Sequence, residues 1–93
     1  MDSNFSSSPN KKGSDHSQSE NCSVLVLHND DVNSFEFVMK TLEEVCNHTL
    51  TQAEQCAMIT HYKGKCEILL GELSDLRATR QELLSRGLSA TIE

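Results

Sequence analysis

The chain has 93 residues, of which 14 are acidic and 8 are basic, so its formal net charge is -6. A chain of this length forms one small domain, which excludes a multidomain enzyme. The acidic balance, without clustered Lys and Arg, argues against a protein that binds nucleic acid or an anionic membrane surface. The sequence contains neither an apolar segment long enough to span a bilayer nor a recognisable signal peptide, so we expect a cytoplasmic protein.

The first 20 residues differ in composition from the rest of the chain. They include seven serines, and their only large apolar residues are Met1 and Phe5. Such a segment cannot bury enough apolar surface to offset the conformational entropy that it would lose on ordering. We therefore expect residues 1–20 to form a disordered N-terminal extension and residues 21–93 to form a single domain.

The first two predicted elements are a strand and a helix. Residues 22–27 are short, mostly apolar and partly β-branched, which is typical of a buried strand. Asn33 precedes Glu36 by three positions, the spacing of a capping box at the start of a helix. Apolar residues then recur at helical spacing, so the sequence predicts a helix over residues 34–46.

Thr51 and Glu54 repeat the capping-box spacing and predict a second helix over residues 52–63. Gly64 is suited to the end of that helix, and residues 66–70 are typical of a second strand.

Ser74 begins a third predicted helix, which Gly87 ends, and residues 88–92 alternate between apolar and polar as in a third strand. The resulting order is β-α-α-β-α-β. It predicts an α+β fold in which three helices pack on one face of a small, three-stranded antiparallel sheet.

Four cysteines, Cys22, Cys46, Cys56 and Cys66, are scattered through the chain without Cys-x-x-Cys spacing. Two disulfides would require an oxidising compartment, so we expect reduced thiols. His48 follows Cys46 closely, but no second pair has the spacing of zinc ligands. Nucleotide-binding, hydrolase and metalloprotease motifs are also missing, so we predict no enzyme, no metal and no cofactor. A small thiol enzyme or zinc module remains an alternative.

The loop Asn29-Asp30-Asp31 and the isolated His61 are the candidates for a binding site. Such a loop often does no more than end a strand, and an isolated histidine on a helix is often structural. A neighbouring carboxylate and amide oxygen can also accept hydrogen bonds from a cation such as an ammonium group. The residue types alone leave both interpretations open.

Together these motifs resemble those of the ClpS family, the adaptors that deliver N-degron substrates to Clp-type AAA+ unfoldases. The resemblance rests on Asn29-Asp30-Asp31, Glu36-Phe37-Val38 and His61-Tyr62-Lys63-Gly64-Lys65, and it covers about residues 22–93. It implies the fold predicted above, which the C-terminal domain of a ribosomal stalk protein shares. A non-enzymatic interaction domain of the stalk type is therefore the alternative function.

The resemblance also implies roles for individual residues. Asn29, Asp30 and His61 would hold the free α-amino group of the substrate's first residue. The bulky side chain of that residue (Leu, Phe, Tyr or Trp) would enter a pocket walled by Asp31, Asn33, Phe35, Val38, Ala57, Thr60 and Leu88.

Three of these pocket positions depart from the family pattern. Met is common in the family where Phe35 and Ala57 stand, and an apolar β-branched residue is common where Thr60 stands. We expect Phe35 to narrow the mouth of the pocket, and Ala57 and Thr60 to widen or wet its floor. The result would be an altered preference among Leu and aromatic first residues.

The implied partners are N-degron substrates and the N-terminal domain of a ClpA- or ClpC-like unfoldase. The chain is several residues shorter than family members around the third predicted helix, where the family contacts the unfoldase. The candidate contacts in this chain are Glu72, Arg77 and Lys65. We expect a monomer.

Overall fold

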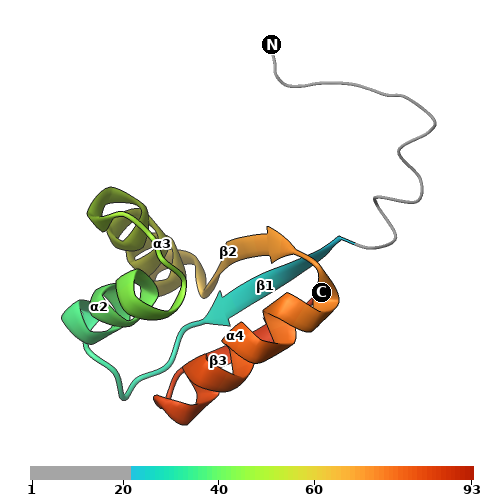
Figure 1. Cartoon of the computed structure of the whole chain (residues 1–93). Coiled ribbons are helices and arrows are strands. Elements are labelled where there is room, and N and C mark those ends of the chain that lie inside the picture. The colour runs from blue at the N-terminus through green and yellow to red at the C-terminus, as the bar shows by residue number, and fades with distance from the viewer. Residues whose placement is uncertain (1–21) are drawn as a thin grey trace.

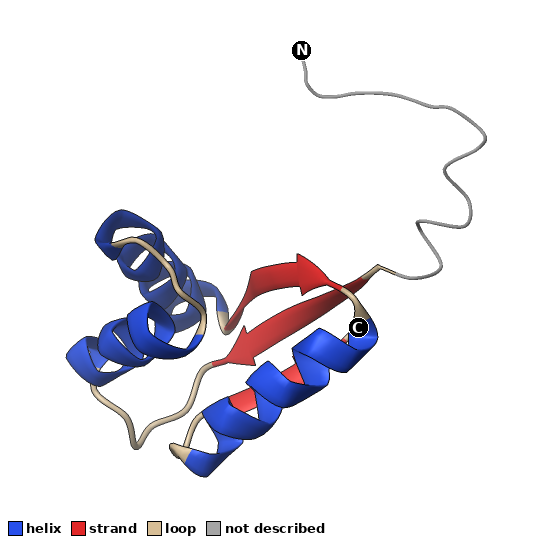
Figure 2. Cartoon of the chain, viewed as in Figure 1, coloured by secondary structure: helices blue, strands red, loops and turns tan. Residues whose placement is uncertain are grey.

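The computed structural model describes residues 22–93, and the extension predicted over residues 1–20 lies outside these described residues. The described chain follows the predicted order (Figures 1 and 2). Its elements are β1 (Ser23–His28), α2 (Phe35–Val45), α3 (Leu50–Lys63), β2 (Lys65–Gly71), α4 (Leu73–Ser85) and β3 (Ser89–Ile92).

The three strands form an antiparallel sheet in the order β2-β1-β3, with β1 in the centre. In Figure 1, α4 runs alongside β3, while α2 and α3 pack together near the end of β1 and the start of β2. This arrangement confirms the predicted α+β fold with a small antiparallel sheet.

The core lies between the sheet and the three helices. Leu25 and Leu27 of β1 are 0% and 1% exposed, and they belong to one apolar cluster with Leu42 of α2, Ala53 of α3 and Leu83 of α4. Burying a leucine side chain stabilises a fold by about 1.5–3 kcal/mol, so this cluster holds the helices against the sheet.

The helix starts differ from the predicted ones. Ser34, not Asn33, is the N-cap of α2, and its hydroxyl accepts a hydrogen bond from the Phe37 amide at 3.1 Å. The prediction placed the cap on Asn33 because its spacing from Glu36 fits a capping box. In the structure the Asn33 amide group instead bonds to Asp30 and to the Gly87 carbonyl, so it is not available to cap the helix.

The predicted capping box of α3 is also two residues too late. Thr49 and Gln52 form the box, with bonds of 3.1 and 2.9 Å, and Thr51 and Glu54 do not. Asn47, with φ at 60°, turns the chain after α2 so that Thr49 arrives in the extended conformation that an N-cap needs.

The remaining helix boundaries lie close to the predictions. α4 begins at Leu73, one residue before the predicted Ser74, after an N-cap residue, Glu72, that makes no side-chain capping bond. Gly64 and Gly87 follow α3 and α4 as predicted. Both have φ above 90°, in the left-handed region that favours glycine.

A β-bulge interrupts the pairing of β1 with β2. Leu25 pairs with Leu69 and Val26 pairs with Glu67, which leaves Ile68 without a partner across the ladder. The Ile68 carbonyl instead accepts a hydrogen bond from His48 Nε2 at 2.9 Å. His48, considered above as a possible metal ligand, therefore joins the α2–α3 connection to the bulge of β2.

All four cysteines are free. Burial, with a smaller contribution from Cys56, raises the pKa of the Cys46 thiol to about 11 and that of Cys66 to about 12. The thiolate is the reactive form of cysteine, so both groups are poor nucleophiles at neutral pH. This chemistry disfavours a thiol enzyme built on either residue.

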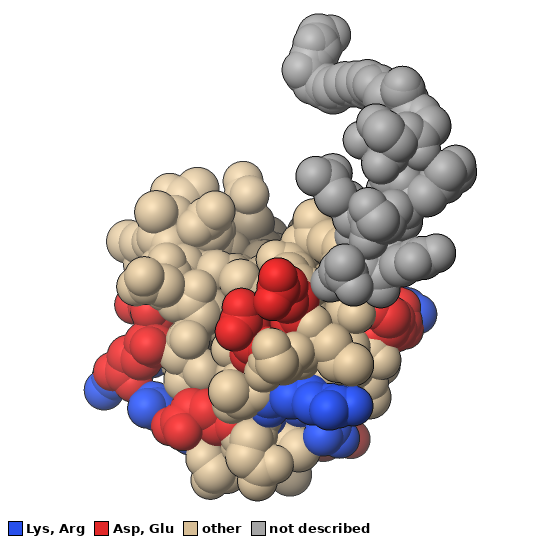
Figure 3. All heavy atoms as spheres, turned by 45° about the vertical axis from the view of Figure 1, so that its right-hand side comes forward, with Lys and Arg blue, Asp and Glu red and all other residues tan. Residues whose placement is uncertain are grey.

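Charged side chains of both signs are interspersed on the surface. On the face shown in Figure 3, basic side chains lie beside acidic ones and form no extended basic area. Arg86, for example, lies 2.6 Å from Glu44 and 3.2 Å from Glu82. Within residues 22–93, no helix is long and apolar enough to cross a membrane.

Candidate functional site

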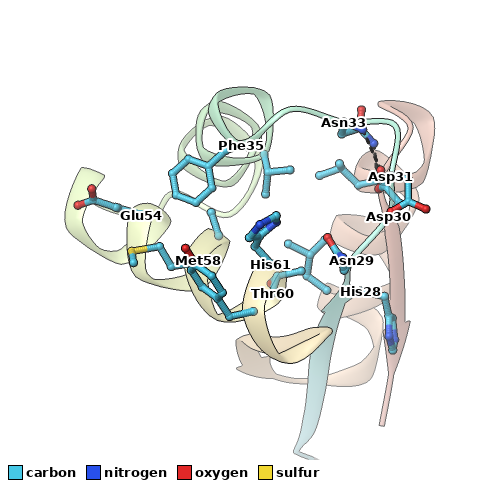
Figure 4. Close-up of a pocket in the computed structure, with 15 residues that line it drawn as sticks. His28, Asn29, Asp30, Asp31, Asn33, Phe35, Glu54, Met58, Thr60 and His61 are labelled. Atoms are coloured by element: carbon cyan, nitrogen blue, oxygen red, sulfur yellow. Dashed lines mark hydrogen bonds between the residues drawn. The ribbon is translucent and has the colours of Figure 1, made fainter.

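A cavity of about 580 Å³ opens between the loop after β1, the start of α2 and one side of α3 (Figure 4). This volume lies within the range of small-molecule and cofactor sites, about 300–1,000 Å³. Every residue that the resemblance assigns to the amino-group or pocket positions lines it. These residues are Asn29, Asp30, Asp31, Asn33, Phe35, Val38, Ala57, Thr60, His61 and Leu88.

The loop at one end of the cavity is held by its own side chains. Asp30 Oδ1 accepts hydrogen bonds from the backbone amides of Val32 and Asn33 at 2.9 and 2.8 Å. Asp30 Oδ2 accepts one from Asn33 Nδ2 at 3.0 Å, the dashed line in Figure 4. Asn33 Nδ2 also donates to the Gly87 carbonyl at 2.9 Å, which ties the loop to the α4–β3 connection.

These hydrogen bonds also set the charge of Asp30. Partial burial raises the pKa of its carboxyl group, but the bonds from the backbone and side chain of Asn33 and from the Val32 backbone together outweigh that effect. The pKa therefore lies below the ordinary value of 3.8. Asp30 is ionised at neutral pH, and Oδ2 retains a lone pair that can accept a further hydrogen bond.

Asn29 and His61 provide the polar groups that are free. The Asn29 backbone amide donates to the Gly64 carbonyl at 2.9 Å, which fixes the loop to the end of α3. Within residues 22–93, neither the Asn29 side chain nor the His61 ring has a hydrogen-bond partner. Figure 4 shows His61 between Asn29 and Phe35. Tyr62 stacks edge-on against His61, with ring centroids 5.0 Å apart at 80°.

The walls of the cavity are apolar. Ala57 and Leu88 are 2% and 3% exposed, and Phe35 and Val38 of α2 are half-buried. The Thr60 hydroxyl donates to the Cys56 carbonyl at 2.8 Å. Its proton is therefore held by the helix backbone, so Thr60 adds less polarity to the floor than we expected.

Five further residues line the cavity and were not predicted: Leu27, His28, Glu54, Met58 and Tyr62. Three of these, Glu54, Met58 and Tyr62, lie four residues apart along α3 and so follow one side of the helix. Helical spacing from Ala57 and His61 could have found them, because residues three or four positions apart are surface neighbours.

The candidate unfoldase contacts lie outside the cavity. Glu72 is the N-cap of α4 and Arg77 lies within its first two turns. Lys65 is at the opposite end of β2, where its Nζ lies 4.0 Å from Glu93 Oε2. A strand rises about 3.3 Å per residue, so the length of β2 separates Lys65 from the other two residues. The three do not form one compact patch.

Comparison with known proteins decides the family. Residues 18–91 match the sequence profile of the family described as ATP-dependent Clp protease adaptor protein ClpS. The chain belongs to the ClpS family. An ATP-dependent Clp protease adapter protein ClpS from Synechococcus sp. (strain CC9902) is 33% identical over 70 residues, which span 74% of this chain and 67% of the relative.

The fold agrees with that of a solved ClpS structure. Agrobacterium tumefaciens ClpS2 bound to L-phenylalaninamide superposes with a TM-score of 0.75 at 23% identity, covering 78% of this chain and 95% of the other. The protein is therefore a ClpS adaptor of the Clp protease, and adaptors of this family are not catalytic.

Proposed function

We propose that this ClpS protein binds the free α-amino group and the bulky apolar side chain of an N-degron substrate, and passes the substrate to a Clp-type AAA+ unfoldase. The supporting observation is the asymmetry of the cavity. One end carries the unpartnered side chains of Asn29 and His61 and the Asp30 carboxylate, whose Oδ2 accepts one hydrogen bond within residues 22–93, and the adjoining walls are apolar.

An ammonium group matches the polar end. It has three N–H donors, and the Asn29 amide oxygen, Asp30 Oδ2 and a His61 ring nitrogen can each accept one hydrogen bond. Charge-assisted hydrogen bonds stabilise a complex by about 1.5–3 kcal/mol each. Acetylation of the amino group removes the charge and most of the donors, so a site of this kind discriminates against blocked and internal residues.

The apolar walls match the side chain of the first residue. Burying a leucine or phenylalanine side chain contributes about 1.5–3 kcal/mol. Association and ordering cost about 4–15 kcal/mol, so we expect dissociation constants near the micromolar range. The L-phenylalaninamide bound to Agrobacterium ClpS2 carries the same two features, a free α-amino group and an aromatic side chain.

The preference among the first residues of substrates should depend on Phe35 and Ala57, the positions where the family commonly has Met. The small Ala57 side chain leaves room at the buried wall, while the rigid Phe35 ring stands at the half-buried side of the cavity. We expect the pocket to rank Leu, Phe, Tyr and Trp differently from a pocket with the more adaptable Met at both positions.

Fluorescence anisotropy with two labelled peptides tests the proposal. The peptides have the same sequence beginning with Leu, and one is acetylated at its N-terminus. We expect the free peptide to bind and the acetylated one not to bind. If no free peptide beginning with Leu, Phe, Tyr or Trp binds, the proposal is wrong, and an interaction domain of the stalk type takes its place.

Delivery is the second half of the proposed function. We propose that residues 1–20 act during handover, and that Glu72, Arg77 and Lys65 contact the unfoldase. Deletion of residues 1–20 should leave peptide affinity unchanged and slow the degradation of a Leu-tagged reporter in a reconstituted Clp system. Unchanged degradation would contradict the role of the extension.

A further inference from the structure

Three cysteines lie together where α3 packs against β2 and the core. Cys46 and Cys66 belong to the apolar core cluster, and Cys56 packs against that cluster from α3. Cys56 and Ile59 are three residues apart, so they lie on the same side of α3. Ile59 lines a shallow hollow together with Cys66. The side of α3 that carries Cys56 therefore faces the start of β2.

The Cys56 thiol acts on both of the other thiols. After burial, which is the largest cause, the neighbouring Cys56 raises the pKa of Cys46 and of Cys66. Its effect on Cys66 includes a side-chain hydrogen bond, whereas its effect on Cys46 is electrostatic alone. Cys66 Sγ also donates to the Glu67 carbonyl at 3.4 Å. These contacts favour Cys66 over Cys46 as the partner of Cys56.

The three thiols differ in their access to solvent. Cys46 and Cys66 are 7% and 9% exposed, whereas Cys56 is only half-buried, so an oxidant in solution reaches Cys56 first. An oxidised Cys56, as a sulfenic acid, condenses with a neighbouring thiol. The high pKa of Cys66 leaves it a small thiolate fraction at neutral pH. Effective molarities of about 10⁵ M or more between adjacent groups offset that small fraction.

We propose that Cys56 and Cys66 form an oxidation site, at which a disulfide joins α3 to β2 and weakens substrate binding. Hydrogen peroxide is the oxidant. The Cys56 sulfur attacks one peroxide oxygen, the O–O bond breaks, and a sulfenic acid and one water form. The Cys66 sulfur then attacks the Cys56 sulfur, the S–O bond breaks, and the hydroxide leaves with the Cys66 proton as a second water. Two thiols are oxidised and one peroxide is reduced, and a dithiol such as dithiothreitol reverses the reaction.

The effect on binding rests on the proposed function, because α3 also carries part of the cavity. A covalent bond between two sulfurs is shorter than a contact between two thiols, so it draws Cys56 towards β2. The next residue, Ala57, is a wall of the cavity, and His61 lies one turn further along the same side of α3. A shift of α3 therefore moves His61 relative to Asn29 and weakens binding of the ammonium group.

Mass spectrometry of the full chain after treatment with hydrogen peroxide tests the site. The remaining thiols are alkylated, and the chain is digested with trypsin and with a protease that cleaves after Glu. Lys or Glu residues separate the three cysteines in the sequence, so each pairing gives a different linked fragment. We expect a link between Cys56 and Cys66. A link between Cys46 and Cys56, or no link within the chain, overturns the proposal.

Three variants identify the residues responsible. Cys56→Ser should abolish the disulfide, and because Cys56 is half-buried the variant should still fold. Cys66→Ala should leave Cys56 as a sulfenic acid, which the probe dimedone traps. Cys46→Ala is the matched control and should still form the disulfide, since Cys46 is the third thiol of the cluster and takes no part in the reaction. A disulfide that is lost in a folded Cys46→Ala variant contradicts the assignment.

Anisotropy with the free Leu peptide tests the effect on binding, in a Cys22→Ser background that removes the exposed thiol able to link two molecules. We expect oxidation to weaken binding about three- to ten-fold, as for partial loss of one charge-assisted hydrogen bond. Dithiothreitol should restore it. Peroxide can also oxidise Met58, which lines the cavity, but dithiothreitol does not reverse that change. The same treatment of a variant that also carries Cys56→Ser should not produce the reversible loss.

The outcomes separate the two proposals. A disulfide between Cys56 and Cys66 that leaves peptide affinity unchanged overturns the effect on binding. Binding of the free Leu peptide without any disulfide after oxidation overturns the oxidation site and leaves the proposed function intact. Failure of the reduced protein to bind any free peptide overturns the proposed function and the effect on binding, while mass spectrometry alone decides the oxidation site.

Discussion

The two sides of the cavity are held in different ways. The loop after β1 keeps its shape through polar side chains, with Asp30 and Asn33 bonding to the loop itself and to Gly87. The opposite side, α3, is held by small buried residues such as Ala53 and Ala57, which press the helix against the core. Its exposed side chains, including Glu54 and Met58, make no comparable bonds within the described chain.

This difference suggests that the loop and α3 contribute to different parts of substrate recognition. A substitution in the loop changes several hydrogen bonds at once. It should therefore lower the affinity for every substrate whose α-amino group binds there. On the open part of α3, a substitution changes one contact, and the effect is confined to substrates that reach it. Recognition of the amino group should therefore be sensitive to mutation, whereas side-chain preference should be adjustable.

The largest effect should come from Asp30→Ala. This change removes an acceptor for the ammonium group together with the anchor for two backbone amides and the Asn33 side chain. Loss of one or more charge-assisted hydrogen bonds should weaken binding of a free Leu peptide by about 30-fold or more in an anisotropy titration.

Asp31→Ala is the matched control for this prediction, because Asp31 also lines the cavity but its carboxylate holds no part of the loop within the described residues. Its effect should be clearly smaller. Equal losses of peptide affinity for the two variants would contradict the prediction, because they would show that the hydrogen bonds of Asp30 within the loop make no difference to binding.

Asn33→Ala should have the next largest effect, mainly on stability. It breaks the bonds to Asp30 Oδ2 and to the Gly87 carbonyl. We expect the free energy of unfolding to fall by about 1–2 kcal/mol, with a drop in melting temperature of roughly 4–8 °C per kcal/mol. Asn29→Ala, which removes a side chain that has no hydrogen-bond partner among residues 22–93, should leave the melting temperature unchanged. A drop as large as that of Asn33→Ala would contradict the prediction.

Ala57→Met should have a smaller and selective effect on the helical side. The added side chain would occupy the inner part of the cavity, where Ala57 is 2% exposed. Peptides beginning with Trp, the largest side chain, should lose several-fold more affinity than peptides beginning with Leu. Equal affinity changes across the panel would mean that Ala57 does not border the first side chain.

The smallest effect is expected on stability as the pH is lowered. The folded-state pKa of Asp30 is depressed, so its contribution to stability is fully present above the ordinary value of 3.8 and is lost as the pH falls through the lower folded value. The difference in melting temperature between the wild type and Asp30→Asn should stay constant from about pH 7 to pH 5 and shrink below about pH 3.8. A difference that already shrinks near pH 6 would point to another titrating group.

Element order and the core were predictable from local patterns, but several boundaries were not. The Thr49–Gln52 and Thr51–Glu54 pairs have the same spacing, and only the turn at Asn47 determines which pair caps α3. Asn33 was similarly ambiguous, because its amide bonds to Gly87, which is distant in sequence. Tertiary contacts of this kind cannot be read from the residues that are adjacent in sequence.

The positions that line the cavity came from the family resemblance, and the structure brings them together, although their roles remain proposals. Glu54, Met58 and Tyr62 also line the cavity. They were missed because the resemblance does not include them as pocket positions. Their four-residue spacing along α3 was visible in the sequence. What could not be seen was which side of the helix would face open space.

The bulge at Ile68 has a consequence for how copies of this protein meet. β2 lies at the edge of the sheet, and edge strands are prone to pair with strands of neighbouring molecules. Its regular pairing is broken where the Ile68 carbonyl turns to His48. A bulged edge is a poor template for a continuous ladder, even though Leu70 on the same strand is 70% exposed. The histidine that secures the α2–α3 connection thus also helps to protect the sheet against aggregation.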